Sequence, residues 1–191
     1  MDVKTGECPG STPICPSDAG NTTKETGSLL ITVSGDTRSS WNVSSDLSSR
    51  LEEYGAKMAA VSQAHDEARH FYVMRDYLKQ RLNYEPVQFE RATISVLEEV
   101  SKTNDLARKL LGMQLMIEPI AITMFRFLRK SNIDPILSEL FVYLENDEAR
   151  HIALGIKHLP KLIKKMNFFQ LTSFLWWQIR LINHEIKGLK A

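Results

Sequence analysis

The chain has 191 residues, with 24 Lys and Arg against 23 Asp and Glu, so its charge is nearly balanced. This balance provides no basic field for nucleic acid, and we expect no nucleic-acid partner. The two cysteines, Cys8 and Cys15, both lie near the N-terminus. A structural zinc site takes about four ligands, and the charged motifs described below contain no thiol, so a zinc finger is excluded.

Residues 1–46 are dominated by Ser, Thr, Gly, Pro, Asn and Asp, with one apolar run, LLITV, at 29–33. We interpret them as a disordered or irregular arm with at most one short strand. The N-terminus lacks the basic start and apolar run of a secretory signal. The most apolar stretch, 167–182, is shorter than the roughly 20 residues needed to span a bilayer. We therefore expect a cytoplasmic protein without an integral membrane segment.

Residues 47–191 form the second predicted region, an all-α domain. Pro and Gly become scarce there, and no stretch alternates as strands do. The predicted helices cover about 48–82, 86–100, 105–130, 135–158 and 168–187, and Pro160 is expected to kink or end the fourth. The last helix, which carries Phe169, Trp176 and Trp177, is expected to pack across a bundle. A membrane-surface or partner-docking role is the alternative for its aromatic face.

The pentapeptide Asp-Glu-Ala-Arg-His occurs twice, in HDEARH at 65–70 and in NDEARH at 146–151. In each copy the Glu and the His are three residues apart, which places both side chains on one face of a helix. In both predicted helices this is also the apolar face. Because ionised carboxylates are costly in an apolar interior, these must be partnered or bound to a metal.

A single acid, Glu118, interrupts the apolar run LLGMQLMIEPIAITMFRFL at 110–128. The segment 83–104, if helical, reaches roughly 33 Å and can return the chain along a bundle, which makes the two motif helices antiparallel. The motifs then become two halves of one site for two metal ions. Carboxylate oxygens with one imidazole for each metal favour iron or manganese. The predicted ligands are Glu67, His70, Glu118, Glu148 and His151.

The residues beside these ligands are expected to orient them. Asp66 and Asp147 can each accept the free ring N–H of a metal-bound histidine, and Arg69 and Arg150 can pair with those aspartates. In the alternative interpretation each Glu-x-x-His is a solvated pair on a helix surface, and Glu118 faces solvent. The remaining histidines, His65, His158 and His184, are expected to lie outside the site.

These motifs resemble those of the ferritin-like superfamily of dinuclear carboxylate proteins, whose bundles combine two Glu-x-x-His helices with two single-Glu helices. The Asp-Glu-x-Arg-His form is most similar to the oxidase and oxygenase branch, which includes the ribonucleotide reductase small subunit. The resemblance covers about residues 48–160. It implies that Glu67 and His70 bind one iron, that Glu148 and His151 bind the other, and that Glu118 is the carboxylate of the third helix.

The chain departs from the family pattern in two places. The family has a further single carboxylate on a helix before the first motif, but VSGDTRSSWN, with Asp36, stands there, and it is not helix-like. Glu52 and Glu53 lie about 20 Å from Glu67 along the same predicted helix. We therefore expect that the first bundle helix is lacking, that the chain is truncated or begins atypically, or that a partner supplies the helix.

The second departure is Met74, four residues after His70, where many reductase subunits have a radical-forming tyrosine; Phe71, Tyr72 and Tyr77 are nearby. This argues against a tyrosyl-radical subunit. The resemblance then implies a di-iron or manganese–iron oxidoreductase that activates O₂ and oxidises a small organic substrate. That substrate is expected among apolar side chains, and a homodimer and an electron-donor protein are expected too. The alternatives are an iron-storage or peroxide-handling protein and a degenerate bundle without catalysis. The expected lining is Met74, Leu115, Ile122, Phe125 and Leu144.

Overall fold

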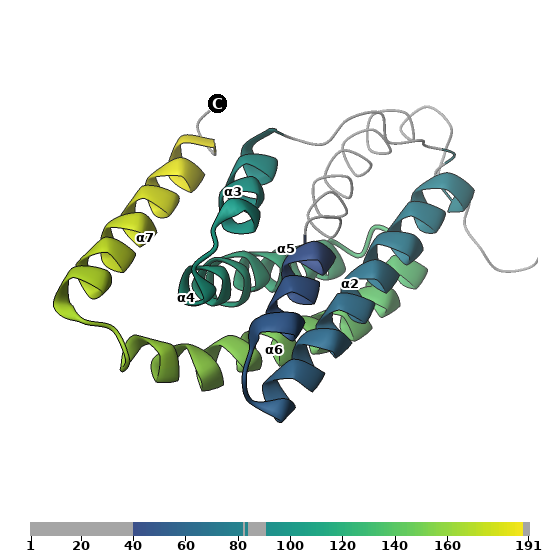
Figure 1. Cartoon of the computed structure of the whole chain (residues 1–191). Coiled ribbons are helices and arrows are strands. Elements are labelled where there is room, and N and C mark those ends of the chain that lie inside the picture. The colour runs from purple at the N-terminus through teal and green to yellow at the C-terminus, as the bar shows by residue number, and fades with distance from the viewer. Residues whose placement is uncertain (1–39, 82, 84–90, 189–191) are drawn as a thin grey trace, which may run out of the picture.

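The computed structural model describes residues 40–81, 83 and 91–188, and side chains in that part of the chain apart from 91–95 and 184–188. Every regular element in these ranges is helical, so the predicted all-α bundle is confirmed (Figure 1). The predicted strand at 29–33, both cysteines and Asp36 lie outside the described residues.

The two motif helices are α2 (Tyr54–Arg81) and α6 (Pro135–Ile163), and they run antiparallel, as predicted. Near one end of the pair, Lys161 Nζ lies 2.5 Å from Glu53 Oε2, just before α2 begins. Near the other end, Arg81 Nε lies 3.0 Å from Asp134 Oδ2. Asp134 also caps α6, because its side chain accepts a hydrogen bond from the Ile136 N–H.

A long apolar helix packs along α6 and consists of α4 (Leu106–Leu110), η1 (Leu111–Ile117) and α5 (Glu118–Ser131). Asp105 caps its start by accepting from the Arg108 N–H at 3.0 Å, and Asn132, in the left-handed conformation, ends it. The segment η1 is a π-helix. By length and composition Leu106–Ser131 could cross a membrane, but half of its most apolar window is buried within the bundle.

Residues 40–50 form a helix, and residues 51–53 separate it from α2. A helix over 40–47 was not predicted, and residues 48–50 were predicted as the start of the first motif helix, which begins only at Tyr54. In the helix over 40–50, the apolar side chains Val43 and Leu47 lie four residues apart and, with Leu51 directly after the helix, pack in the core. Two of its serines bond back onto the helix, Ser48 Oγ to the Ser45 carbonyl at 2.7 Å and Ser49 Oγ to the Asp46 carbonyl at 2.8 Å. The expected irregular arm is therefore wrong for 40–46, and the expectation that no helix precedes the first motif helix is also wrong.

Two further helices complete the fold, α3 (Arg91–Lys102) and α7 (Phe168–Gly188), which pack against each other beside the end of the long apolar helix (Figure 1). The additional C-terminal helix was predicted. α6 continues past Pro160 instead of ending at His158. Proline removes only its own N–H, and the Pro160 carbonyl still accepts from Lys164 N at 3.1 Å.

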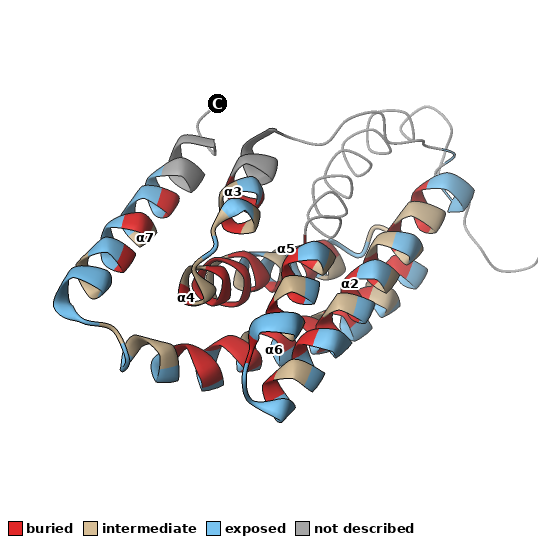
Figure 2. Ribbon diagram, in the orientation of Figure 1, coloured by how far each residue is buried: buried red, intermediate tan, exposed pale blue. Residues whose placement is uncertain are grey.

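The core consists of two apolar clusters separated by a polar layer, and the buried residues, red in Figure 2, lie mainly where the helices face one another. The first cluster includes Leu47, Ala60, Met113 and Leu154, and the second includes Met74, Leu78, Phe125, Phe141 and Leu144. Along α2, α6 and the long apolar helix, buried polar residues stand between the two. This polar layer contains both motifs.

Candidate metal centre

All five predicted ligands lie in the polar layer. Their residues are between 1% and 3% exposed, so the alternative of solvated surface pairs does not hold. One carboxylate oxygen from each of Glu67, Glu118 and Glu148 and one ring nitrogen of His151 lie within 4.8 Å of one another. His70 adjoins this group, because its Nδ1 is 3.1 Å from Glu148 Oε1. Three helices thus bring the five side chains together.

Both imidazole rings turn the same nitrogen toward the glutamates. His151 Nδ1 lies 2.8 Å from Glu148 Oε2 and 3.2 Å from Glu67 Oε1. The two ring centroids are 6.1 Å apart. Each Nδ1 is therefore placed to ligate an ion held by the carboxylates, and each Nε2 points to the opposite side of its ring.

The Nε2 atoms meet the aspartates of the motifs, but crosswise. His70 Nε2 lies 2.9 Å from Asp147 Oδ2, and His151 Nε2 lies 3.5 Å from Asp66 Oδ2. Each motif therefore orients the histidine of the other, a relation that the sequence prediction did not specify. A carboxylate on the outer ring nitrogen fixes the tautomer that leaves Nδ1 free for a metal.

Two arginines join the aspartates, as predicted. Arg69 Nη2 contacts Asp66 Oδ1 at 3.2 Å and Asp147 Oδ2 at 2.5 Å. Arg150 Nη2 contacts Asp147 Oδ1 at 2.5 Å and Asp66 Oδ2 at 3.3 Å. The two aspartates and two arginines balance in charge, so the three glutamates are the acids of the site that no arginine offsets.

A pair of buried glutamines also belongs to the polar layer, and the sequence analysis gave neither a role. Gln63 Nε2 donates to Glu118 Oε1 at 2.6 Å, and Gln114 Nε2 donates to Gln63 Oε1 at 2.9 Å. Each glutamine precedes a ligand glutamate by four residues, Gln63 before Glu67 and Gln114 before Glu118. A glutamine one turn before a ligand, within an apolar stripe, was the signal that could have found them.

The π-helix η1 delivers Glu118 to the site. The Glu118 N–H bonds to the Met113 carbonyl, five residues back, and Pro119 follows without an N–H of its own. Single π-turns inside α-helices are frequent at functional sites. Gly155 of α6 admits this turn, because a Cβ there would lie 2.6 Å from Gln114 Cβ and 3.1 Å from Leu115 Cγ.

The protonation states in the cluster reflect the close approach of three buried glutamates to one another. Burial raises the pKa of Glu118 well above its usual range, and the charges of Glu148 and Glu67 raise it further. Burial raises the pKa of Glu67 as well, again with Glu148 adding to the effect. Burial also acts to raise the pKa of Glu148, but hydrogen bonds from His151 and His70 outweigh it and hold that pKa below its usual range.

The imidazoles respond in the opposite sense. Burial acts to lower the pKa of His70, but its contacts with Asp147 and Glu148 outweigh burial and raise the pKa to about 9. Burial likewise acts to lower the pKa of His151, but its contacts with Asp66, Glu148 and Glu67 outweigh burial and raise that pKa well above its usual range. Without a metal, both rings therefore carry protons at neutral pH, and these two positive charges stand where cations would be expected.

The donor set fits divalent cations. Glu67 Oε1 and His70 Nδ1 are buried, and neither makes a hydrogen bond of good geometry. Their nearest polar neighbours, His151 Nδ1 at 3.2 Å and Glu148 Oε1 at 3.1 Å, lie inside the cluster. Such unsatisfied buried atoms are costly unless something binds them. Carboxylate oxygens with imidazole suit iron or manganese better than a metal that prefers sulfur. This buried group of glutamates and histidines can thus hold a metal ion.

The predicted apolar lining is divided between the two clusters. Met74, Phe125 and Leu144 belong to the second cluster, Ile122 is buried, and Leu115 packs on the first cluster. Met74, the residue in place of the radical-forming tyrosine, is completely buried. Tyr77 is buried one turn beyond it, and Tyr72 is exposed.

The carboxylate expected on a preceding helix is not found among residues 40–50. The acid of that segment, Asp46, lies 3.0 Å from Arg50 Nη1 and 2.9 Å from Lys109 Nζ. Ser44, in contrast, is fully buried, and its hydroxyl has no hydrogen-bond partner. Asp36 remains outside the described residues, and Glu53 binds Lys161 instead of the cluster.

The other histidines and the groove at the α6–α7 corner lie apart from the cluster. His65 is exposed, His158 is buried with its Nδ1 3.4 Å from Glu53 Oε2, and the His184 side chain is not described.

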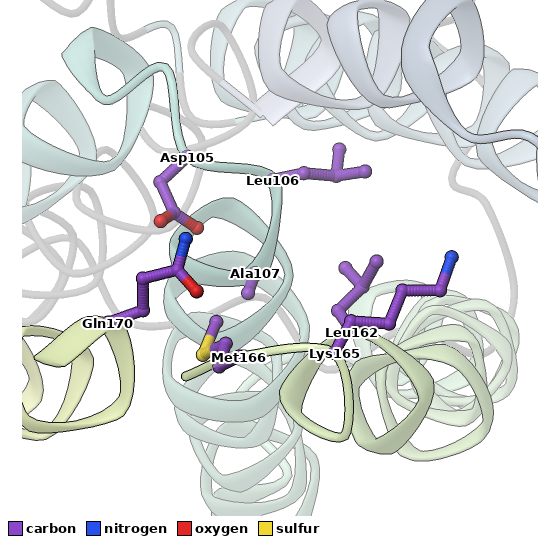
Figure 3. Close-up of a pocket in the computed structure, with 7 residues that line it drawn as sticks. All are labelled: Asp105, Leu106, Ala107, Leu162, Lys165, Met166 and Gln170. Carbon is purple, nitrogen blue, oxygen red and sulfur yellow. The ribbon is translucent and has the colours of Figure 1, made fainter. Parts of the chain in front are cut away.

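A groove of about 280 Å³ shares no residue with the candidate metal centre (Figure 3). Its lining consists of Asp105, Leu106, Ala107, Leu162, Lys165, Met166 and Gln170.

Comparisons with known proteins do not assign the chain to a family. No family model matches it, and neither a curated protein nor a solved structure does so.

Proposed function

We propose that the protein is a ferritin-like, dinuclear metal oxidoreductase that activates O₂ and oxidises a small organic substrate. The observation that carries this proposal is the orientation of the two histidines. Both turn Nδ1 toward three buried glutamates and Nε2 toward an aspartate of the opposite motif. Two copies of one motif then provide one half-site each, in the arrangement that the family resemblance implies.

Glu67 and His70 would hold one ion, Glu148 and His151 the other, and Glu118 would contribute a carboxylate to either or both. Two iron ions, or one manganese and one iron, supply the reduction of O₂ when bound. The protein's own contribution is to fix the ligands and exclude water. Asp147 and Asp66 hold the imidazoles in the ligating tautomer, and the arginines neutralise these aspartates.

The second apolar cluster supplies the dry side of the site. Met74, Phe125 and Leu144 are each no more than 1% exposed. An apolar wall of this kind keeps water away from reactive groups and favours an apolar substrate portion. On the other side of the polar layer, which we call the amide side, Gln63 donates to the Glu118 carboxylate and Gln114 donates to the Gln63 amide oxygen.

The test is anaerobic loading with Fe²⁺ followed by measurement of O₂ uptake. The expected result is that about two Fe²⁺ ions bind per chain and that O₂ is consumed. Glu118→Ala should abolish the uptake. Glu145→Ala is the matched control, because Glu145 is an acid of α6 that binds Arg126 and Arg129 outside the cluster.

Other outcomes would assign the chain to the alternative functions. Accumulation of many irons per chain in a large multi-subunit shell would indicate iron storage. Absence of bound iron would indicate a bundle that has lost its metal chemistry, and would refute the proposal.

A further inference from the structure

Helix α7 is apolar on two opposite faces. Its inner face, with Phe174, Trp177 and Leu181, is no more than 5% exposed and packs in the first apolar cluster. The opposite face is also apolar, yet it is open to solvent. We call it the outer face of α7, and it consists of Phe168, Phe169, Leu175, Trp176 and Ile179.

The exposure of this outer face is large for a soluble domain. Phe169 is 81% exposed, Phe168 76% and Trp176 68%. Phe168, Leu175 and Ile179 are seven and then four residues apart, which places their side chains on one side of a helix, and Trp176 lies beside them, three residues before Ile179. Packing against the bundle requires only one apolar stripe, so a second, solvent-facing stripe indicates a further binding surface.

The charge of the chain is distributed unevenly around this face. Residues 149–184 contain no Asp or Glu, although the protein as a whole is nearly neutral. The basic residues of that stretch are Arg150, Lys157, Lys161, Lys164, Lys165 and Arg180. Lys164 and Lys165 are exposed at the corner between α6 and α7, directly before Phe168 and Phe169.

Acids from other parts of the chain approach some of these cations. Glu53 contacts Lys161, Glu52 lies 3.7 Å from Lys165 Nζ, and Glu99 pairs with Arg180. The Lys165 and Glu52 side chains are 70% and 91% exposed, so water screens that contact strongly. Lysines beside exposed aromatic rings, without acids in the same segment, are the composition of helices that lie in a lipid headgroup layer.

We propose that the outer face of α7 and the adjoining lysine corner bind the surface of an anionic lipid bilayer. α7 lies in the headgroup plane, Phe168, Phe169 and Trp176 enter the acyl boundary, and Lys164 and Lys165 contact lipid phosphates. Tryptophan suits this depth, because its ring is apolar and its N–H can meet the polar layer. A second copy of the chain fits less well, because a symmetric contact through this face brings the lysine corners of both copies toward it.

The test is co-sedimentation of the full chain with vesicles of phosphatidylcholine, with and without phosphatidylglycerol. We expect binding to the anionic vesicles that weakens as salt is added. Lys164→Gln should weaken partitioning roughly fivefold, the effect of about one lysine near an anionic surface. Phe168→Ser with Phe169→Ser should remove most of the binding, and far-UV circular dichroism verifies that these exposed substitutions leave the fold intact.

Two matched controls lie on α5, away from α7. Phe127 is a phenylalanine that is 61% exposed, and Lys130 is an exposed lysine. Phe127→Ser and Lys130→Gln should leave vesicle binding unchanged. Iron content should be the same in all of these variants, so the outcome is independent of the proposed metal chemistry.

A second readout locates the contact. Brominated lipids should quench tryptophan fluorescence in the natural chain, whereas Trp176→Phe should keep vesicle binding and lose most of the quenching. Absence of binding to anionic vesicles, or equal loss in the α5 controls, would overturn the proposal. A dimer that Trp176→Ser dissociates, with no vesicle binding in either form, would also overturn it and assign the face to a second copy of the chain.

Discussion

The two copies of Asp-Glu-Ala-Arg-His are identical in sequence and nearly equivalent in contacts, but their flanking residues differ. Four residues before the glutamate, α2 has Gln63 and α6 has Leu144. Four residues after the histidine, α2 has Met74 and α6 has Gly155. Because the helices are antiparallel, Gln63 and Gly155 belong to the amide side of the polar layer, and Met74 and Leu144 belong to the second apolar cluster.

This comparison separates two roles. The repeated pentapeptide determines the ligands and the carboxylates behind them, which is why each aspartate serves the histidine of the other copy. The flanks determine the surroundings, with amides on one side and a dry apolar wall on the other. The O₂-activating site that we propose would benefit from such a division, because carboxylates need donors to orient them and a reacting centre needs protection from water. The predictions below test either the equivalence of the motifs or the difference between their flanks.

The largest effect is expected when the pH of the metal-free protein is raised. This experiment tests the buried carboxylates and imidazoles that the two half-sites have in common. The pKa of His70 is raised from an ordinary value of 6.5 to about 9. Its stabilising contribution is therefore complete below about pH 6.5 and is lost as pH rises through 9, a loss of about 3 kcal/mol. Urea unfolding of chelator-treated protein across this range measures it.

Mn²⁺ should cancel that decline, because bound ions replace the protons. Stability of the metal-free protein that is constant or increases between pH 6.5 and 9 would contradict the expectation.

Gly155→Ala tests the difference in flanks, since the other half-site carries a methionine at the corresponding position. The added methyl would meet Gln114 Cβ at 2.6 Å, so the π-turn or α6 must shift. We expect a loss of about 2–3 kcal/mol in the free energy of unfolding, as for overpacking of a core. Gly55→Ala, where nothing lies within 4 Å of the new Cβ, is the control and should be neutral or slightly stabilising.

Asp147→Asn and Asp66→Asn test the crossed pairing. In a His151→Ala background, only the half-site of His70 remains. The Nε2 atom of His70 lies 2.9 Å from Asp147 Oδ2. Asp147→Asn should then weaken Mn²⁺ binding about 10–100-fold, whereas Asp66→Asn should have a much smaller effect. Calorimetric titration measures both, and a larger effect of Asp66→Asn would show that the pairing is not crossed.

Gln63→Leu gives α2 the residue that α6 has four positions before its glutamate, Leu144. We expect the smallest effect from this substitution. The substitution removes the donor to Glu118 and the acceptor for Gln114, which should cost about 1–2 kcal/mol of stability in metal-free protein. Gln80→Leu, an exposed position of the same helix, should stay within about 0.5 kcal/mol. A stabilised Gln63→Leu variant would mean that the amide chain is not needed.

The sequence was sufficient for much of this arrangement. Glu-x-x-His on an apolar face, repeated, predicted two buried half-sites, and Asp134 with Pro135 marked the start of α6 correctly. These signals are local, since they depend on helical spacing and capping within one segment.

The rest depended on contacts between segments. The Ser-rich composition of residues 1–46 argued against a helix at 40–46, but burial of Val43 and Leu47 outweighed that preference. The crossed pairing of Asp66 and Asp147 and the role of Gln63 follow from the register of α2 against α6. The π-turn before Glu118 depends on the space that Gly155 leaves on a different helix. None of these contacts between helices can be inferred from one segment of the sequence alone.

The most direct test of the two half-sites is the metal content of protein expressed in medium supplemented with iron and manganese. The natural chain should contain about two ions per molecule, and His70→Ala and His151→Ala should each contain about one. Only trace metal in the natural chain, or two ions retained in both variants, would contradict the account.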